Sequence, residues 1–163
     1  MRLRQGTGLL AGALLLQLAV GSGPLGFFWT PLFVGFAYLA AALAGGRLGG
    51  YWATAVVFVP FGAVVAFLAE NRDLNVRAQA AYIVALGLAA LLGALLQHRG
   101  FLLDLFGVGG AILLLGMFYA LDRYWVEVLG RADTYAALIA LVGLWSIVAG
   151  VRAGGGGSAA RAG

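Results

Sequence analysis

The stretch that decides the fold reads AQAAYIVALGLAALLGALLQ, residues 78–97, and holds twenty residues without a charged side chain. A helix of that length spans about 30 Å, because each residue adds about 1.5 Å, and the hydrocarbon core of a bilayer is about 30 Å thick. A backbone inside lipid must satisfy its own hydrogen bonds, so this stretch predicts a transmembrane helix.

Five more apolar stretches of similar length fill most of the chain. The six predicted spans cover residues 6–23, 27–45, 51–69, 78–97, 101–121 and 134–151. Most of the connections between them are short, so sequential helices should be antiparallel neighbours within a single domain. We therefore expect an all-α fold, a polytopic membrane bundle of six transmembrane helices.

The composition excludes several other classes of protein. The chain of 163 residues is 63% hydrophobic and 10% charged, too few polar residues to cover a soluble domain of this size. The net charge of +4 comes from arginines that stand at the ends of the spans and do not cluster. This pattern indicates membrane topology and argues against nucleic-acid binding. The expected partner is the lipid bilayer, and another membrane protein or a second copy of the chain stays open.

The arginines also predict an orientation. With the N-terminus in the cytoplasm, six arginines face inward and four face outward, which is the bias that insertion favours. The inner set is Arg2, Arg4, Arg47, Arg99, Arg152 and Arg161, and the outer set is Arg72, Arg77, Arg123 and Arg131. Five acids, Glu70, Asp73, Asp122, Glu127 and Asp133, fall on the outer side. We expect both termini to be cytoplasmic.

Each end of the chain has a second interpretation. Arg2 and Arg4 precede an apolar run and small residues, as in a signal peptide, and cleavage after Gly21 would leave five spans. The next apolar run begins almost at once, at Phe27, so we expect the first span to be retained.

At the other end of the chain, residues 153–163 predict a flexible, glycine-rich cytoplasmic tail. This tail contains GGGGS, which is also a common engineered linker, and the sequence leaves both origins open.

The sequence lacks the residues that most membrane enzymes require. It has no cysteine and a single histidine, His98, which excludes thiol nucleophiles, cysteine zinc sites and haem held by two histidines of one chain. Ser146 lacks the flanking glycines of a nucleophile turn, and Asp104 is the only acid within a predicted span. We predict a protein that is not an enzyme and has no metal site and no cofactor.

Three residues within the predicted spans are candidates for an intramembrane site. Asp104 is expected to be an interfacial anchor or ion-pair partner, with a proton or cation relay as the alternative. Gln17 should hydrogen-bond to another helix or to a backbone carbonyl, although a substrate contact is also open. Pro60 lies in the middle of the third span and should kink that helix, either for packing or to line a cavity.

Small residues recur in the fourth and fifth spans. They are Gly87, Ala90, Gly93 and Ala94 in the fourth span, and Gly107, Gly109, Gly110 and Gly116 in the fifth. Small side chains let helix backbones approach closely in lipid. We expect them to bring the two neighbouring spans together, with a dimer face as the alternative.

The segment 122–131 predicts a short amphipathic helix on the outer surface. Arg123, Glu127 and Arg131 recur at a spacing of four residues, while Tyr124 and Trp125 supply aromatic surface suited to the headgroup region. The segment would anchor the chain at the membrane surface or, alternatively, form a surface with which a partner docks through Tyr124, Trp125, Glu127 and Arg131.

Four short groups of residues can be compared with known membrane proteins. They are Val59-Pro60-Phe61-Gly62, the polar loop with Asn71, Ala81-Tyr82, and Gly143-Leu144-Trp145. Their layout resembles small multi-pass bacterial membrane proteins, some of which are similar to the membrane part of LiaF-type envelope-stress proteins. The resemblance implies a bacterial inner (cytoplasmic) membrane and transfers no functional residue. We expect a non-enzymatic structural or accessory subunit, with a small transporter or substrate-binding subunit using Asp104 and Gln17 as the alternative.

Overall fold

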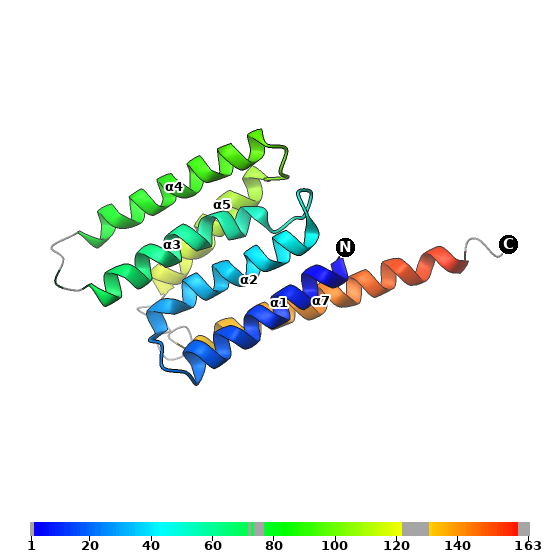
Figure 1. The fold of residues 1–163 in the computed structure, drawn as a ribbon, viewed down its shortest axis with the longest axis horizontal. Coiled ribbons are helices and arrows are strands. Elements are labelled where there is room, and N and C mark those ends of the chain that lie inside the picture. Colours follow the sequence, from blue (N-terminus) through cyan, green and yellow to red (C-terminus); the bar gives the residue numbers. More distant parts are fainter. Residues whose placement is uncertain (1, 72, 74–76, 122–130, 160–163) are drawn as a thin grey trace.

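The structure is a computed structural model that describes residues 2–71, 73, 77–121 and 131–159. Every regular element within these ranges is helical, so the predicted all-α fold is confirmed for them (Figure 1). The α-helices are α1 (Arg2–Leu16), α2 (Thr30–Gly45), α3 (Trp52–Glu70), α4 (Ala78–His98), α5 (Leu105–Leu121) and α7 (Ala132–Ala159). A π-helical turn, η1 (Gln17–Gly21), follows α1, and a 3-10 turn, η2 (Phe27–Trp29), precedes α2.

Five helical segments are long and apolar enough to cross a membrane. They are Arg2–Gly21, Phe27–Gly45, Trp52–Glu70, Ala78–His98 and Ala132–Arg152. Each corresponds to one of the six predicted spans, with bounds that differ by a few residues. The fifth predicted span gives a shorter apolar helix, α5, of 17 residues.

The start of α5 differs from the predicted start at residue 101 because local contacts hold residues 101–104 outside the helix. Gly100 has a positive φ of 80°, which ends the preceding turn in a conformation that favours glycine. The Leu102 amide donates to the Arg47 carbonyl at 2.8 Å, and Asp104 Oδ1 accepts from the Phe106 amide at 3.0 Å. The carboxylate of Asp104 therefore caps α5 and lies outside it.

The last helix runs past the predicted end of the sixth span at Val151. α7 continues to Ala159 and includes Gly154–Ser158, where a flexible tail beginning at residue 153 was predicted. A helix that is already formed gains one hydrogen bond for each residue it adds, so glycines can extend it although they weaken it. Residues 160–163 of the predicted tail lie outside the described residues.

The helices form a row with two helices behind it. In Figure 1, α4, α3, α2 and α1 lie in that order, with α5 behind α3 and α7 behind α1. α7 packs along α1, so the first and last helices are neighbours. The expected close pairing of α4 with α5 is wrong, since each packs mainly against α3. Gly93 of α4 faces Leu103, in the connector before α5, and Val56 of α3, whereas Gly107 of α5 faces Ala53 of α3.

Small residues allow the close contact between α1 and α2. A Cβ added to Gly12 would collide with Ala37, and one added to Gly8 would lie 3.3 Å from the backbone of Ala41. Ala37 and Ala41 are almost completely buried, as is Leu9 beside them. Since lipid is as apolar as leucine, helices in a membrane associate through such close packing.

The charged residues separate toward two ends of the bundle. The arginine end comprises Arg2, Arg4, Arg47, Arg99 and Arg152, and the acid end comprises Glu70, Asp73 and Asp133 together with Arg77 and Arg131. Contacts tie the segments at the acid end together: Trp29 Nε1 donates to Glu70 Oε1 at 3.1 Å. Asp104 is an acid at the arginine end, because the connector before α5 lies beside Arg47.

Candidate functional site

The three intramembrane candidates lie at different depths and do not form one site. Gln17 is near the acid end, where its Nε2 donates to Asp133 Oδ1 at 2.9 Å. Asp133 also pairs with Arg131, from Nη2 to Oδ2 at 2.9 Å. The partner of Gln17 is thus on another helix and 116 residues away, beyond the reach of any local sequence pattern.

Asp104 and Pro60 have structural settings that differ from each other. Asp104 is exposed at the start of α5, and among the described residues it has no ion-pair partner. Pro60 is half-buried inside α3, and the helix runs without interruption from Trp52 to Glu70. Pro60 lines none of the three cavities described below.

The predicted outer-surface helix falls mostly on residues about which the structure says nothing. Tyr124, Trp125 and Glu127 lie outside the described residues. Arg131 is described, and its exposed side chain donates to Asp133 at the start of α7. The amphipathic helix over 122–131 therefore stays a prediction.

A hollow of about 550 Å³ lies between the row and the two helices behind it. We call it the groove. It is lined by Val34, Tyr38, Thr54, Phe58, Gly107, Gly110, Ala111, Leu114, Tyr135, Leu138, Ile139 and Val142. α2 and α3 form its floor, while α5 and α7 form its walls. The small residues of α5 keep that wall thin, and most of the lining is aliphatic or aromatic.

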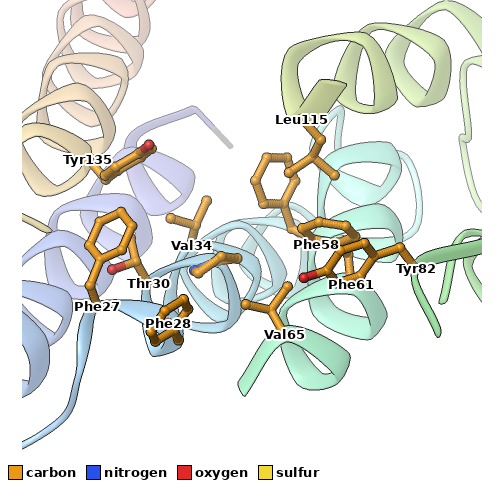
Figure 2. Close-up of a pocket in the computed structure, with 11 residues that line it drawn as sticks. Phe27, Phe28, Thr30, Val34, Phe58, Phe61, Val65, Tyr82, Leu115 and Tyr135 are labelled. Carbon is orange, nitrogen blue, oxygen red and sulfur yellow. The ribbon is translucent and has the colours of Figure 1, made fainter. Parts of the chain in front are cut away.

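Toward the acid end the groove continues into a smaller aromatic cavity of about 210 Å³, shown in Figure 2. The two hollows share Val34, Phe58 and Tyr135. Figure 2 shows Tyr135 of α7 and Leu115 of α5 on opposite sides of this cavity. The hydroxyl of Thr30 at its edge is buried and has no hydrogen-bond partner among the described residues. The hollow space therefore follows the helices from the middle of the bundle to the acid end.

A third cavity, of about 520 Å³, lies at the arginine end, and we call it the arginine-end cavity. It is lined by Arg2, Gln5, Leu48, Gly50, Tyr51, Trp145, Ser146 and Ala149. The hydroxyl groups of Tyr51 and Ser146 share a hydrogen bond of 2.7 Å, and Ser146 Oγ donates to the Val142 carbonyl at 2.9 Å. Unlike the groove, this cavity is lined by a charged side chain, that of Arg2, in addition to its hydrogen-bonding groups.

The groove and the arginine-end cavity are adjacent. Val142 lines the groove, and Ser146, one turn further along α7, lines the cavity. On the other side, the ring of Tyr38 in the groove lies 5.7 Å from the ring of Tyr51 in the cavity. An apolar hollow therefore borders a polar one along the same face of α7.

Sequence reasoning did not select the residues of the arginine-end cavity. Tyr51 and Ser146 are 95 residues apart, and their contact exists only because α7 returns to α1 at the end of the chain. Gln5 carried a usable signal, since it is a polar residue that begins the buried face of α1. Among the described residues no group of three His, Cys, Asp or Glu side chains could hold a metal ion.

Comparison with known proteins adds no further constraint. No family model, no curated protein and no solved structure matches the chain. The resemblance to the membrane part of LiaF-type proteins therefore has no support from these comparisons, and the geometry of the cavities has to carry the functional argument.

Proposed function

We propose that this chain is a non-enzymatic, six-span accessory subunit of the bacterial cytoplasmic membrane, and that its groove holds the acyl chain of a lipid. The observation that carries this proposal is the groove itself, about 550 Å³ of space with a mainly apolar lining between α2, α3, α5 and α7. A mainly apolar hollow of this kind suits an apolar occupant, since most of its lining side chains would offer water no hydrogen bond.

The same lining argues against the transport of a polar solute. Moving a polar group into an apolar site without replacing its hydrogen bonds costs about 2–7 kcal/mol. Gln17 and Asp104, which the transport hypothesis would use, lie at the acid end and the arginine end respectively, and neither lines the groove. The accessory-subunit hypothesis therefore fits the geometry better than a small transporter does.

The sixth span and the orientation are part of the proposal. α5 has 17 residues and spans about 26 Å, and a helix slightly short of the hydrocarbon thickness is tolerated at a small cost through local thinning of the bilayer. Five arginines at one end of the bundle favour placing that end, with both termini, in the cytoplasm.

Reporter fusions test this topology. Fusions at Arg47 and Arg99 should be cytoplasmic, and fusions at Asp73 and Arg131 should be external. An external reporter at Arg99 would contradict this topology.

The groove is tested with two neighbouring glycines of α5. Gly110 lines the groove and Gly109 does not, and for both residues an added Cβ would meet no described atom within 4 Å. We expect Gly110→Leu to reduce co-purifying phospholipid several-fold, because the new side chain fills the groove, whereas Gly109→Leu should retain it. Native mass spectrometry of the protein released from mild detergent measures the bound lipid. Equal retention by both variants would contradict the proposal.

A further inference from the structure

We propose that the arginine-end cavity binds the phosphodiester group of a phospholipid whose acyl chain lies in the groove. This inference rests on the proposed function and adds to it a defined headgroup site. It follows from the charge of the cavity, from the hydrogen-bonding groups in its wall, and from its position next to the groove.

Arg2 supplies the charge. Its side chain lines the cavity, and no ion pair of Arg2 with another described residue is present. No acidic residue is among those that line the cavity, so the local charge is positive. A guanidinium group binds phosphate oxygens through two parallel hydrogen bonds, which makes arginine well suited to a phosphodiester.

Gln5 supplies a buried polar group in need of a partner. Its side chain is only 6% exposed, and its Nε2 has no hydrogen-bond partner among the described residues. The amide lies against Gly45 and Gly49, where an added Cβ would meet Nε2. Rotating the amide by half a turn exchanges its nitrogen and oxygen, so Gln5 can offer a donor or an acceptor to an occupant.

The Tyr51 and Ser146 hydroxyl groups add a donor that can be redirected. Either oxygen can donate in the 2.7 Å bond between them. When Ser146 donates to Tyr51, the proton of the Tyr51 hydroxyl is free to donate to a phosphate oxygen. When Ser146 donates to the Val142 carbonyl instead, Tyr51 donates to Ser146 and the pair is satisfied without an occupant. The empty and occupied cavities are therefore both compatible with this pair.

The two hollows together are long enough for a lipid of one leaflet of a bilayer. Along α7 the lining runs from Ala149 in the arginine-end cavity to Tyr135 in the groove. Fourteen residues of helix rise about 21 Å, and half of the hydrocarbon core is about 15 Å. A phospholipid of the leaflet at the arginine end would thus place its phosphate beside Arg2 and its acyl chain in the groove.

The test compares two arginines of the same helix. Both side chains are exposed, but Arg2 lines the cavity and Arg4 does not. Full-length Arg2→Gln and Arg4→Gln variants lose the same charge at the same end of α1. In detergent titrated with short-chain phosphatidylglycerol, native mass spectrometry should show about tenfold weaker binding for Arg2→Gln, since a charge-assisted hydrogen bond accounts for roughly that factor. Arg4→Gln should bind as the unmodified protein does, and Tyr51→Phe should show a smaller loss than Arg2→Gln.

Two further ligands separate the sources of binding. Diacylglycerol has the acyl chains without the phosphate, and its binding should be insensitive to Arg2→Gln but reduced by Gly110→Leu. Inorganic phosphate should compete poorly with the lipid. Equal losses in the two arginine variants, or efficient competition by inorganic phosphate, would overturn the headgroup site. Sensitivity of diacylglycerol to Gly110→Leu would still support the groove in that case, whereas failure of every lipid to bind would overturn the proposed function as well.

Discussion

Glycines behave in opposite ways on the two sides of this bundle. Where α2 meets α3, a Cβ on Gly35 would lie 2.8 Å from the backbone nitrogen of Val59, and one on Gly62 would collide with the backbone of Leu32. On α4 and α5, a Cβ on Gly87, Gly109 or Gly116 would meet no described atom within 4 Å. Glycine allows helix contact on the first side, whereas these three glycines on the second side border open space.

This difference shows which part of the molecule is held rigidly and which part is left accessible. The row of α1, α2 and α3, with α7 behind α1, forms the packed side. We call α4 and α5 the open side. α4 buries only Ala85, Ala89 and Gly93, and large side chains such as Ile83 and Leu91 are each 70% exposed. In a bilayer, such exposed apolar surface is covered by lipid chains. The groove lies at the boundary between the two sides.

The largest effect is expected from Gly35→Leu on the packed side. The new side chain would press on the backbone of α3 at Phe58 and Val59, which cannot move aside as a flexible side chain could. Overpacking of this kind costs typically 1–3 kcal/mol, and we expect about 3 kcal/mol in the free energy of unfolding because the obstacle is backbone. Unfolding in mixed micelles with increasing dodecyl sulfate measures the change.

The matched control is Gly87→Leu on the open side. No described atom would obstruct the side chain, and leucine favours a helix over glycine by roughly 0.5–1 kcal/mol. We expect unchanged or slightly higher stability. A loss at Gly87 as large as that at Gly35 would mean that α4 is packed against something and that the contrast between the two sides is false.

A smaller effect is expected from Tyr51→Phe, which removes a polar link within the packed side. The Tyr51 hydroxyl joins the start of α3 to Ser146 of α7, and Ser146 keeps its bond to the Val142 carbonyl when Tyr51 is changed. Loss of a neutral hydrogen bond costs about 1 kcal/mol. Comparing Tyr51→Phe, Ser146→Ala and the double variant measures the coupling; strictly additive losses would show that the two hydroxyl groups do not interact.

The helices could be predicted from the sequence because their signal is local. A run such as residues 78–97 is apolar throughout, and α4 covers Ala78–His98 almost as expected. The neighbours of each helix could not be predicted in the same way. Short connections favoured α4 beside α5, but α3 is the neighbour of both, and α7 packs on α1 from the far end of the chain. An apolar face in lipid does not identify its partner, because lipid and protein surfaces are about equally apolar.

The candidate site was harder to predict for the same reason. Asp104, Gln17 and Pro60 were selected because polar residues and prolines are uncommon within apolar runs, and that rule finds residues one at a time. The groove is instead formed by common residues such as Val34, Phe58 and Leu138, whose proximity depends on the tertiary arrangement. Only Gln5, a buried polar residue near the start of α1, could have indicated the arginine-end cavity.

The smallest effect is expected at Asp104, where the open side begins. Its carboxylate accepts from the Phe106 amide and caps α5, a role that asparagine performs about as well and alanine does not. We expect Asp104→Ala to lower the free energy of unfolding by about 0.5–1 kcal/mol, and Asp104→Asn to leave it nearly unchanged.

Dodecyl sulfate titration of both variants provides the comparison. Equal losses in both variants would show that the negative charge matters more than the cap, for example by balancing the arginines at that end. Because α5 forms one wall of the groove, Asp104→Ala should also release bound lipid slightly faster than Asp104→Asn, which would connect the cap to the open side of the bundle.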